Sequence, residues 1–156
     1  MIIINRIKSY KMKRIFTLCV LLVLCNSCAS QTQISKSVSG NWEVYKYKIG
    51  PIAAMTTEDA SILKGKKIQI TSNQVNEFGI IFKNCVFDQS KINIEEYFDS
   101  FKLDYNLIDL KFKGKQTFLY SCKCYDIDQE ETYFEFVENG NELLYSKEGF
   151  FFHLKK

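Results

Sequence analysis

The sequence predicts a mainly β fold, an antiparallel β-barrel or half-barrel of about eight strands with two short helices. Short apolar or alternating segments recur through residues 40–156, and turn-forming residues separate them. Aromatic residues make up 15% of the chain and hydrophobic residues 46%, which is enough for one core in a chain of 156 residues. Closing such a sheet into a barrel removes the exposed strand edges that an open sheet leaves.

The expected strands follow one another as hairpins. The first, Asn41–Ile49, ends at Gly50-Pro51. Ser72-Asn73 and Asn139-Gly140-Asn141 are connections typical of hairpins. The other strands are expected at residues 66–71, 74–82, 106–113, 115–125, 132–138, 142–146 and 149–156. Alternation along residues 115–125 places four side chains on one face: Phe118, Tyr120, Cys122 and Cys124.

Two segments have the capping residues and the apolar spacing of helices. The first covers residues 57–64, with Thr56 as N-cap, Asp59 three residues later and Gly65 as the stop signal. The second begins after Asn93, another typical N-cap residue. Its apolar residues recur at helical spacing and are expected to pack on a sheet: Ile94, Tyr97, Phe98 and Phe101.

Residues 1–27 are predicted to be a signal peptide. Lys13 and Arg14 precede a short apolar run that does not reach the ~20 residues of a membrane-spanning helix. Met12 is a possible true start. Of the 21 basic residues, five precede Cys28, which leaves 16 lysines against 18 acidic residues and a net charge of −2. No arginine follows residue 27, so a nucleic-acid partner is not expected.

The end of this segment, LCNSC, resembles the lipobox of bacterial lipoprotein signal peptides. The resemblance implies that Cys28 carries a lipid, that residues 28–39 form a tether, and that the membrane is a partner through the lipid. It also implies a place in the bacterial cell envelope, on the outer membrane, facing the periplasm or the surface. Asn26 and Cys25 depart from the usual lipobox residues. Ordinary cleavage, giving a secreted or periplasmic domain, is the alternative.

Residues 40–156 are expected to form one lipocalin-like β domain. Gly40-x-Trp42 at the head of the first strand resembles the G-x-W signature of lipocalins, in which the tryptophan closes one end of a barrel that carries a small hydrophobic ligand. Lipocalins also pack an arginine over this tryptophan and have no helix between their first two strands, and this chain departs from both features. Its layout further resembles small uncharacterised bacterial exported proteins with a G-x-W start and a G-x-F-F-x-L end, here Gly149–Leu154.

The aromatic residues provide the main functional signal. Thirteen phenylalanines and nine tyrosines are more than a small core usually needs. The candidate ligand-binding residues, which can line an apolar cup, are Trp42, Tyr45, Tyr47, Tyr120 and Tyr133. A filled core with tyrosine hydroxyls reaching water is the other interpretation. The sequence thus predicts a non-catalytic binding module for a small apolar ligand. The alternative is a protein-binding envelope lipoprotein, such as an inhibitor of a lytic enzyme or an assembly factor.

Three cysteines besides Cys28 lie in the expected domain and are disulfide candidates in an oxidising compartment: Cys85, Cys122 and Cys124. A bond from Cys85 to one of the other two is favoured. Cys122 and Cys124 lie two residues apart on one strand, at the edge of the distance that a disulfide can span. The chain has a single histidine, so no metal site is expected, and no cofactor is implied.

No catalytic site is predicted, and the protein is not expected to be an enzyme. His153 is accompanied by no Ser or Cys nucleophile motif. The acidic stretch 126–131 mimics the start of a calcium loop, but Glu131 stands where such a loop needs glycine, and Val137 where it needs glutamate. We interpret this stretch as a solvated hairpin loop.

Overall fold

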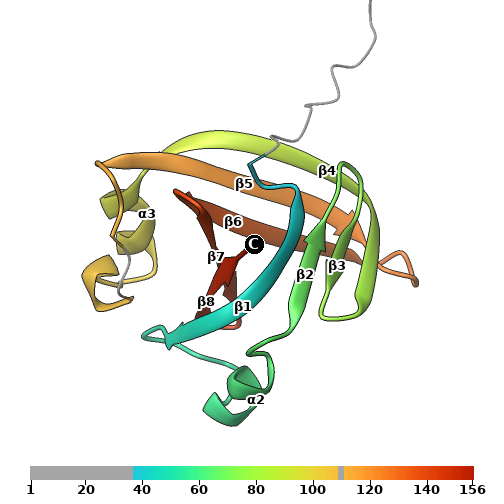
Figure 1. The fold of residues 1–156 in the computed structure, drawn as a ribbon, viewed down its shortest axis with the longest axis horizontal. Coiled ribbons are helices and arrows are strands. Elements are labelled where there is room, and N and C mark those ends of the chain that lie inside the picture. Colours follow the sequence, from blue (N-terminus) through green and yellow to red (C-terminus); the bar gives the residue numbers. More distant parts are fainter. Residues whose placement is uncertain (1–36, 109–110) are drawn as a thin grey trace, which may run out of the picture. The chain divides into compact units, whose positions relative to one another are not determined.

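Eight antiparallel strands, each hydrogen-bonded to the next in sequence, close into a barrel because the last strand also pairs with the first (Figure 1). The computed structural model describes residues 37–108 and 111–156; Cys28, the expected signal peptide and most of the expected tether lie outside this range. The strands are β1 (Gly40–Ile49), β2 (Lys67–Ile70), β3 (Val75–Glu77), β4 (Ile80–Asn93), β5 (Gln116–Tyr125), β6 (Glu131–Asn139), β7 (Glu142–Lys147) and β8 (Phe150–Lys155). The predicted mainly β barrel is confirmed, and it is fully closed.

The two predicted helices are also confirmed. They are α2 (Thr57–Ile62) and α3 (Ile94–Ser100), and a 3-10 turn, η1 (Tyr105–Ile108), follows α3. Thr56 accepts a hydrogen bond from the backbone of Asp59, and Asn93 accepts from the first turn of α3, as expected of N-caps. Capping fixes where both helices begin.

The meander gives the barrel two different ends. The connections β1–β2, β3–β4, β5–β6 and β7–β8 lie at one end, which we call the α2 end because the β1–β2 connection contains α2 (Figure 1). The connections β2–β3, β4–β5 and β6–β7 lie at the other, which we call the Trp42 end because Trp42 lies near the start of β1. This alternation decides which connections lie together at each end of the barrel.

Two predicted strands are wrong. Residues 74–82 form a tight hairpin, β3 and β4, because Phe78 and Gly79 both adopt positive φ (55° and 104°) and Asn76 accepts a hydrogen bond from the Gly79 amide at 2.9 Å. Residues 106–113 were expected as a strand, but the chain forms η1 at its start; residues 109–110 lie outside the described range. Tyr105 and Phe112 instead pack on Phe98 of α3, with ring centroids 5.9 and 6.0 Å away.

Strand β4 is longer than the pattern suggested. Most of this strand, residues 83–93, was not anticipated, and this part pairs with β5. A register shift between Lys83 and Val86, where Asn84 has φ 53°, breaks the alternation that would have revealed it.

The apolar side chains form two clusters on opposite faces of the sheet. The inner cluster fills the barrel and includes Trp42, Val44, Ile68, Phe82, Phe87, Tyr120, Phe134, Phe136, Tyr145, Phe150 and Phe152. The outer cluster lies between α3 and the outside of the barrel and includes Ile94, Phe98, Leu103, Val137, Leu144 and Phe151. The predicted stripe on α3 therefore does pack on a sheet.

Trp42 is buried near the start of β1, at the end of the barrel that is named after it. The indole Nε1–H donates to the carbonyl of Val38 at 2.8 Å, and the side chain is 2% exposed. The Lys156 ammonium lies 4.8 Å from the ring centroid and also donates to the Ser37 carbonyl at 3.2 Å. Residues from the two ends of the domain thus meet at this tryptophan.

The loop after β1 is fastened to the β7–β8 turn. The Gly50 amide donates to Gly149 O at 2.7 Å, and the Ala54 amide donates to Glu148 O at 2.9 Å. Gly149 has φ +81°, and a Cβ there would collide with the carbonyl oxygen of Ile52. Only glycine fits this close approach of two backbones.

Gly149→Ala should destabilise the protein clearly more than Gly65→Ala. Both glycines have φ +81°, so both variants bear the cost of a left-handed alanine, about 1–2 kcal/mol. Only at position 149 does the new methyl group meet backbone, and we expect a further loss of about 1–3 kcal/mol. Urea unfolding of the two variants measures the difference, and equal losses would contradict the fastening of this loop.

Candidate functional site

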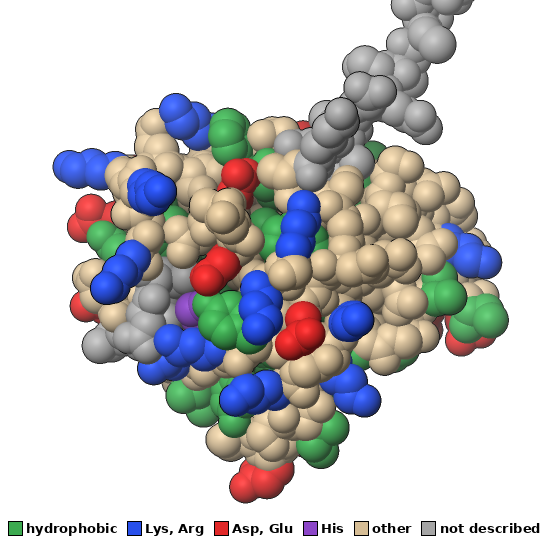
Figure 2. Space-filling model, viewed as in Figure 1, with side chains coloured by type: hydrophobic (Ala, Val, Ile, Leu, Met, Phe, Trp, Pro, Cys, Tyr) green, Lys and Arg blue, Asp and Glu red, His purple; other side chains and the backbone are tan. Residues whose placement is uncertain are grey.

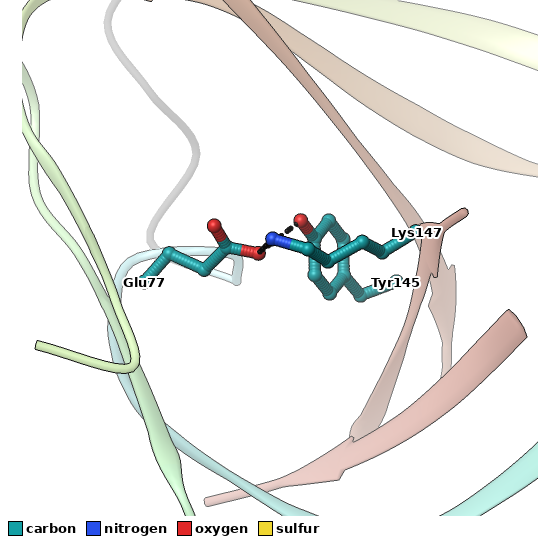
Figure 3. A network of polar contacts seen from close by, with 3 residues as sticks. All are labelled: Glu77, Tyr145 and Lys147. Carbon is teal, nitrogen blue, oxygen red and sulfur yellow. Dashed lines mark hydrogen bonds and ion pairs between the residues drawn. The ribbon is translucent and has the colours of Figure 1, made fainter. Parts of the chain in front are cut away.

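A charged side chain crosses the interior of the barrel near the α2 end. Glu77, the last residue of β3, is 3% exposed and points toward β7 (Figure 3). Its Oε1 accepts hydrogen bonds from the Tyr145 hydroxyl at 2.5 Å and from the Lys147 ammonium at 2.6 Å. In a ring of eight strands β3 and β7 are four places apart, so these bonds join opposite walls.

Strand alternation puts all three residues of this network inside. Val75 and Glu77 share the inward face of β3, and Tyr145 and Lys147 share that of β7, where Leu143 also belongs to the inner cluster. The sequence analysis did not identify this site. The available signal was an acidic residue at an inward position of a short strand, but the hairpin that defines β3 was itself not predicted.

The chemistry of the network is that of a buried ion pair held by a neutral phenol. Burial, and then the negative charge of Glu77, raise the pKa of Tyr145 well above its ordinary value, so its hydroxyl keeps its proton and donates. Lys147 is 27% exposed and keeps contact with solvent. Both donors bind Oε1, so among the described residues Oε2 of Glu77 receives no hydrogen bond. That oxygen can accept from a hydroxyl, amine or amide of a bound molecule.

Aromatic rings surround the network. Tyr145 stacks on Phe136 with centroids 5.3 Å apart, and Phe134 lies edge-on to Phe82 at 5.0 Å. Tyr47 packs on Phe150 at 5.9 Å. These rings pack on one another inside the barrel, so the interior presents the aromatic faces and edges that apolar ligands contact.

At the α2 end, few side chains of α2 and its flanking loops are buried against the inner cluster, and exposed apolar residues surround this end. Ala60 is the buried residue of the six-residue helix α2, and Met55, Leu63 and Phe78 are partly buried against the inner cluster. Five of the six isoleucines that are exposed in the described range come from β1, the loop after it, α2, the start of β4 and the β5–β6 connection. We call them the isoleucine rim: Ile49, Ile52, Ile62, Ile80 and Ile127.

The structure does not bring the five candidate ligand-binding residues together. Trp42, Tyr47 and Tyr120 face inward, but at different levels, and the Tyr120 hydroxyl donates to Glu138 at 2.7 Å. Tyr45 lies edge-on to His153, centroids 5.9 Å apart; burial, and then hydrogen bonding to Glu142, raise its pKa to about 12. Tyr133 is 66% exposed on the outer wall and donates to Glu131.

The cysteines form one disulfide and leave one thiol in the described range. Cys85 of β4 is bonded to Cys124 of β5, one of the pairings that the sequence left open. Cys122 is free and buried, with its Sγ 3.8 Å from that of Cys124. Burial raises the pKa of the Cys122 thiol from 9.0 to about 12, so thiol–disulfide exchange within this trio is suppressed.

The acidic stretch after β5 is a turn, as predicted. Asp126 Oδ1 accepts from the amides of Asp128 and Glu130 at 2.9 and 2.8 Å, which organises the hairpin connection. Among the described residues no group of three or more His, Cys, Asp or Glu side chains is placed to hold a metal ion.

Comparison of the chain with family models, with curated proteins and with solved structures gave no match. Within residues 37–108 and 111–156, no helix is both long enough and apolar enough to cross a bilayer. Functional inference therefore depends on the geometry of the barrel itself.

Glu77→Gln should destabilise the protein strongly, whereas Glu131→Gln should have little effect. Each glutamate accepts from one tyrosine and one lysine: Tyr145 and Lys147 for Glu77, Tyr133 and Lys123 for Glu131. They differ in burial, because Glu131 and Lys123 lie on the outer surface. Removing the charge of Glu77 should lower the free energy of unfolding by about 3 kcal/mol. This value is near the lower end of the range for buried ion pairs because the Lys147 side chain reaches solvent.

Chemical denaturation of both variants and the wild type measures this contrast. The Glu131 variant is the matched control for loss of a carboxylate that binds a tyrosine and a lysine. A Glu77 variant as stable as the Glu131 variant would show that the contact across the barrel contributes nothing.

Cys122 should resist alkylation in the folded protein. With its pKa at about 12 rather than 9.0, the thiolate fraction at pH 8 is about a thousandfold lower than that of an ordinary cysteine, and burial blocks access as well. Peptide mapping after iodoacetamide treatment should find Cys122 unlabelled in buffer and labelled in urea without reductant. Equal labelling under both conditions would refute its burial.

Proposed function

We propose that this protein is a non-catalytic binding module for a small, mainly apolar molecule that carries a hydrogen-bond donor. The observation that supports this is a buried carboxylate, Glu77, beneath the isoleucine rim at the α2 end. An eight-stranded barrel has room for one small ligand when side chains adjust. Replacing a buried ion pair by apolar residues often stabilises a protein. We therefore propose that Glu77 and Lys147 are present for ligand binding rather than for stability.

In this proposal the ligand enters the barrel interior at the α2 end, beside helix α2. The helix has only six residues, and the loop before it is joined to the rest of the barrel by backbone hydrogen bonds to Glu148 and Gly149. Apolar residues exposed around an opening favour capture of apolar molecules. Displacement of Met55 and Leu63 would bring the ligand's donor to Glu77 Oε2 and its apolar body to the rings of the inner cluster.

The place where the module works is part of the same proposal. We propose that Cys28 carries the lipid, so that the domain is held at the bacterial cell envelope. The Cys85–Cys124 disulfide supports an oxidising compartment. A chain secreted or released to the periplasm without the lipid is the alternative.

The rim variants Ile62→Ser and Ile80→Ser test the proposal. Full-length protein, purified from membranes into nanodiscs, is titrated with the neutral apolar fluorophore N-phenyl-1-naphthylamine, and energy transfer is read from Trp42, the only tryptophan. Each buried isoleucine contact contributes about 1–2 kcal/mol, so the double variant should bind about tenfold or more weakly. The intact mass of the same sample reports whether Cys28 is acylated.

Val86→Ser is the matched control. Val86 is 71% exposed, like Ile62 and Ile80 at 65% and 58%, but it points outward from the wall of β4. Empty nanodiscs give the background. Loss of binding in the rim variant alone supports the proposal, and equal affinity in all three proteins would overturn it.

A protein partner is the second candidate function. It is favoured by the outer wall of β4, β5 and β6, where Val86 and Tyr133 are exposed on either side of Lys123, which pairs with both. An envelope protein such as a lytic enzyme would then be the partner. Failure of the wild-type protein to bind the fluorophore would leave this candidate in place of the first.

A further inference from the structure

A hollow lies outside the barrel, against the outer face of β7 and β8. Its volume is about 300 Å³, at the lower end of the range for small-molecule sites. Phe151 of β8 forms its floor, and Phe101 after α3 is edge-on to Phe151 with centroids 5.6 Å apart. Pro51 and Ile52, from the loop after β1, form another wall.

The sheet separates this hollow from the barrel interior. Phe150 and Phe152 belong to the inner cluster, whereas Phe151 between them belongs to the outer cluster beneath α3. A molecule in the hollow therefore meets none of the residues of the Glu77 network. Apart from Ile52, which lines the hollow and also belongs to the isoleucine rim, the two sites share no residue.

The walls of the hollow are already in place. The Gly50–Gly149 and Ala54–Glu148 hydrogen bonds fix the loop after β1, and Phe151 is 1% exposed at the base. A preformed hollow needs little ordering when a ligand binds, which favours affinity for a small molecule.

The polar side chains that line the hollow are Ser100, Lys102 and Ser146, and each can donate a hydrogen bond, although the Ser100 hydroxyl already donates to the Tyr97 carbonyl. Within residues 37–108 and 111–156, neither the Lys102 nor the Ser146 side chain makes a hydrogen bond or ion pair. Ser146 is the register partner of Phe151 and shares its outer face. Lysine side chains lie along β1 and around α3, the elements that border the hollow (Figure 2).

We infer that this hollow binds a small apolar carboxylate. The aromatic floor and Ile52 take the apolar body, while Lys102 and the Ser146 hydroxyl take the carboxylate, which accepts from both. The preference is opposite to that of the barrel interior, where the buried Glu77 disfavours anions.

Fluorine NMR with 4-fluorobenzoate tests this inference on the full-length protein. Its signal should broaden on addition of the wild type, and 4-fluorobenzyl alcohol should bind about tenfold more weakly because it lacks the charge. Lys102→Met keeps the length of the exposed side chain and should weaken benzoate binding about tenfold, and Ser146→Ala should weaken it less.

Lys64→Met is the matched control, since Lys64 is likewise exposed just after a short helix. It should bind like the wild type, and so should the rim variant Ile62→Ser/Ile80→Ser, which separates this site from the proposed function. No broadening with the wild type, equal binding of the alcohol, or full affinity in Lys102→Met would each overturn the inference.

Discussion

Pairing of β1 with β8 is the constraint from which most of the structure follows. Residues Glu43–Ile49 lie against Phe150–Lys155, and once this seam is made the sheet has no free edge. A closed ring of eight strands has a fixed interior, and that interior must be filled. The large rings at the inward positions of β6, β7 and β8 meet this requirement by packing on one another.

The filled interior explains why the charged network matters. Glu77 and Lys147 come from opposite walls; the Glu77 carboxylate is buried, while the Lys147 side chain keeps partial contact with solvent. The same three residue types meet again on the outer wall, at Glu131, Tyr133 and Lys123, where solvent screens them. Identical chemistry is thus present twice in one molecule, and only burial separates a strong interaction from a weak one.

Local patterns predicted the parts of the fold that depend on neighbouring residues. The caps at Thr56 and Asn93, the α3 stripe and the alternation of β5 are all readable within a few residues. The Phe78-Gly79 turn was missed because phenylalanine at positive φ is uncommon, and the bulge at Asn84 concealed β4. The Glu77 network was out of reach because its partners lie 68 and 70 residues away, and no local rule says which strands will face each other. The outer hollow combines three distant segments and was hidden for the same reason.

The meeting of Ser37 and Lys156 at the Trp42 end sets the polarity of the domain. The first and the last described residues of the domain therefore lie at the same end of the barrel. The α2 end, with its isoleucine rim, is the opposite end. With a lipid on Cys28, as we propose, the attachment would join the domain at the Trp42 end. The isoleucine rim would then lie at the end of the barrel remote from that attachment.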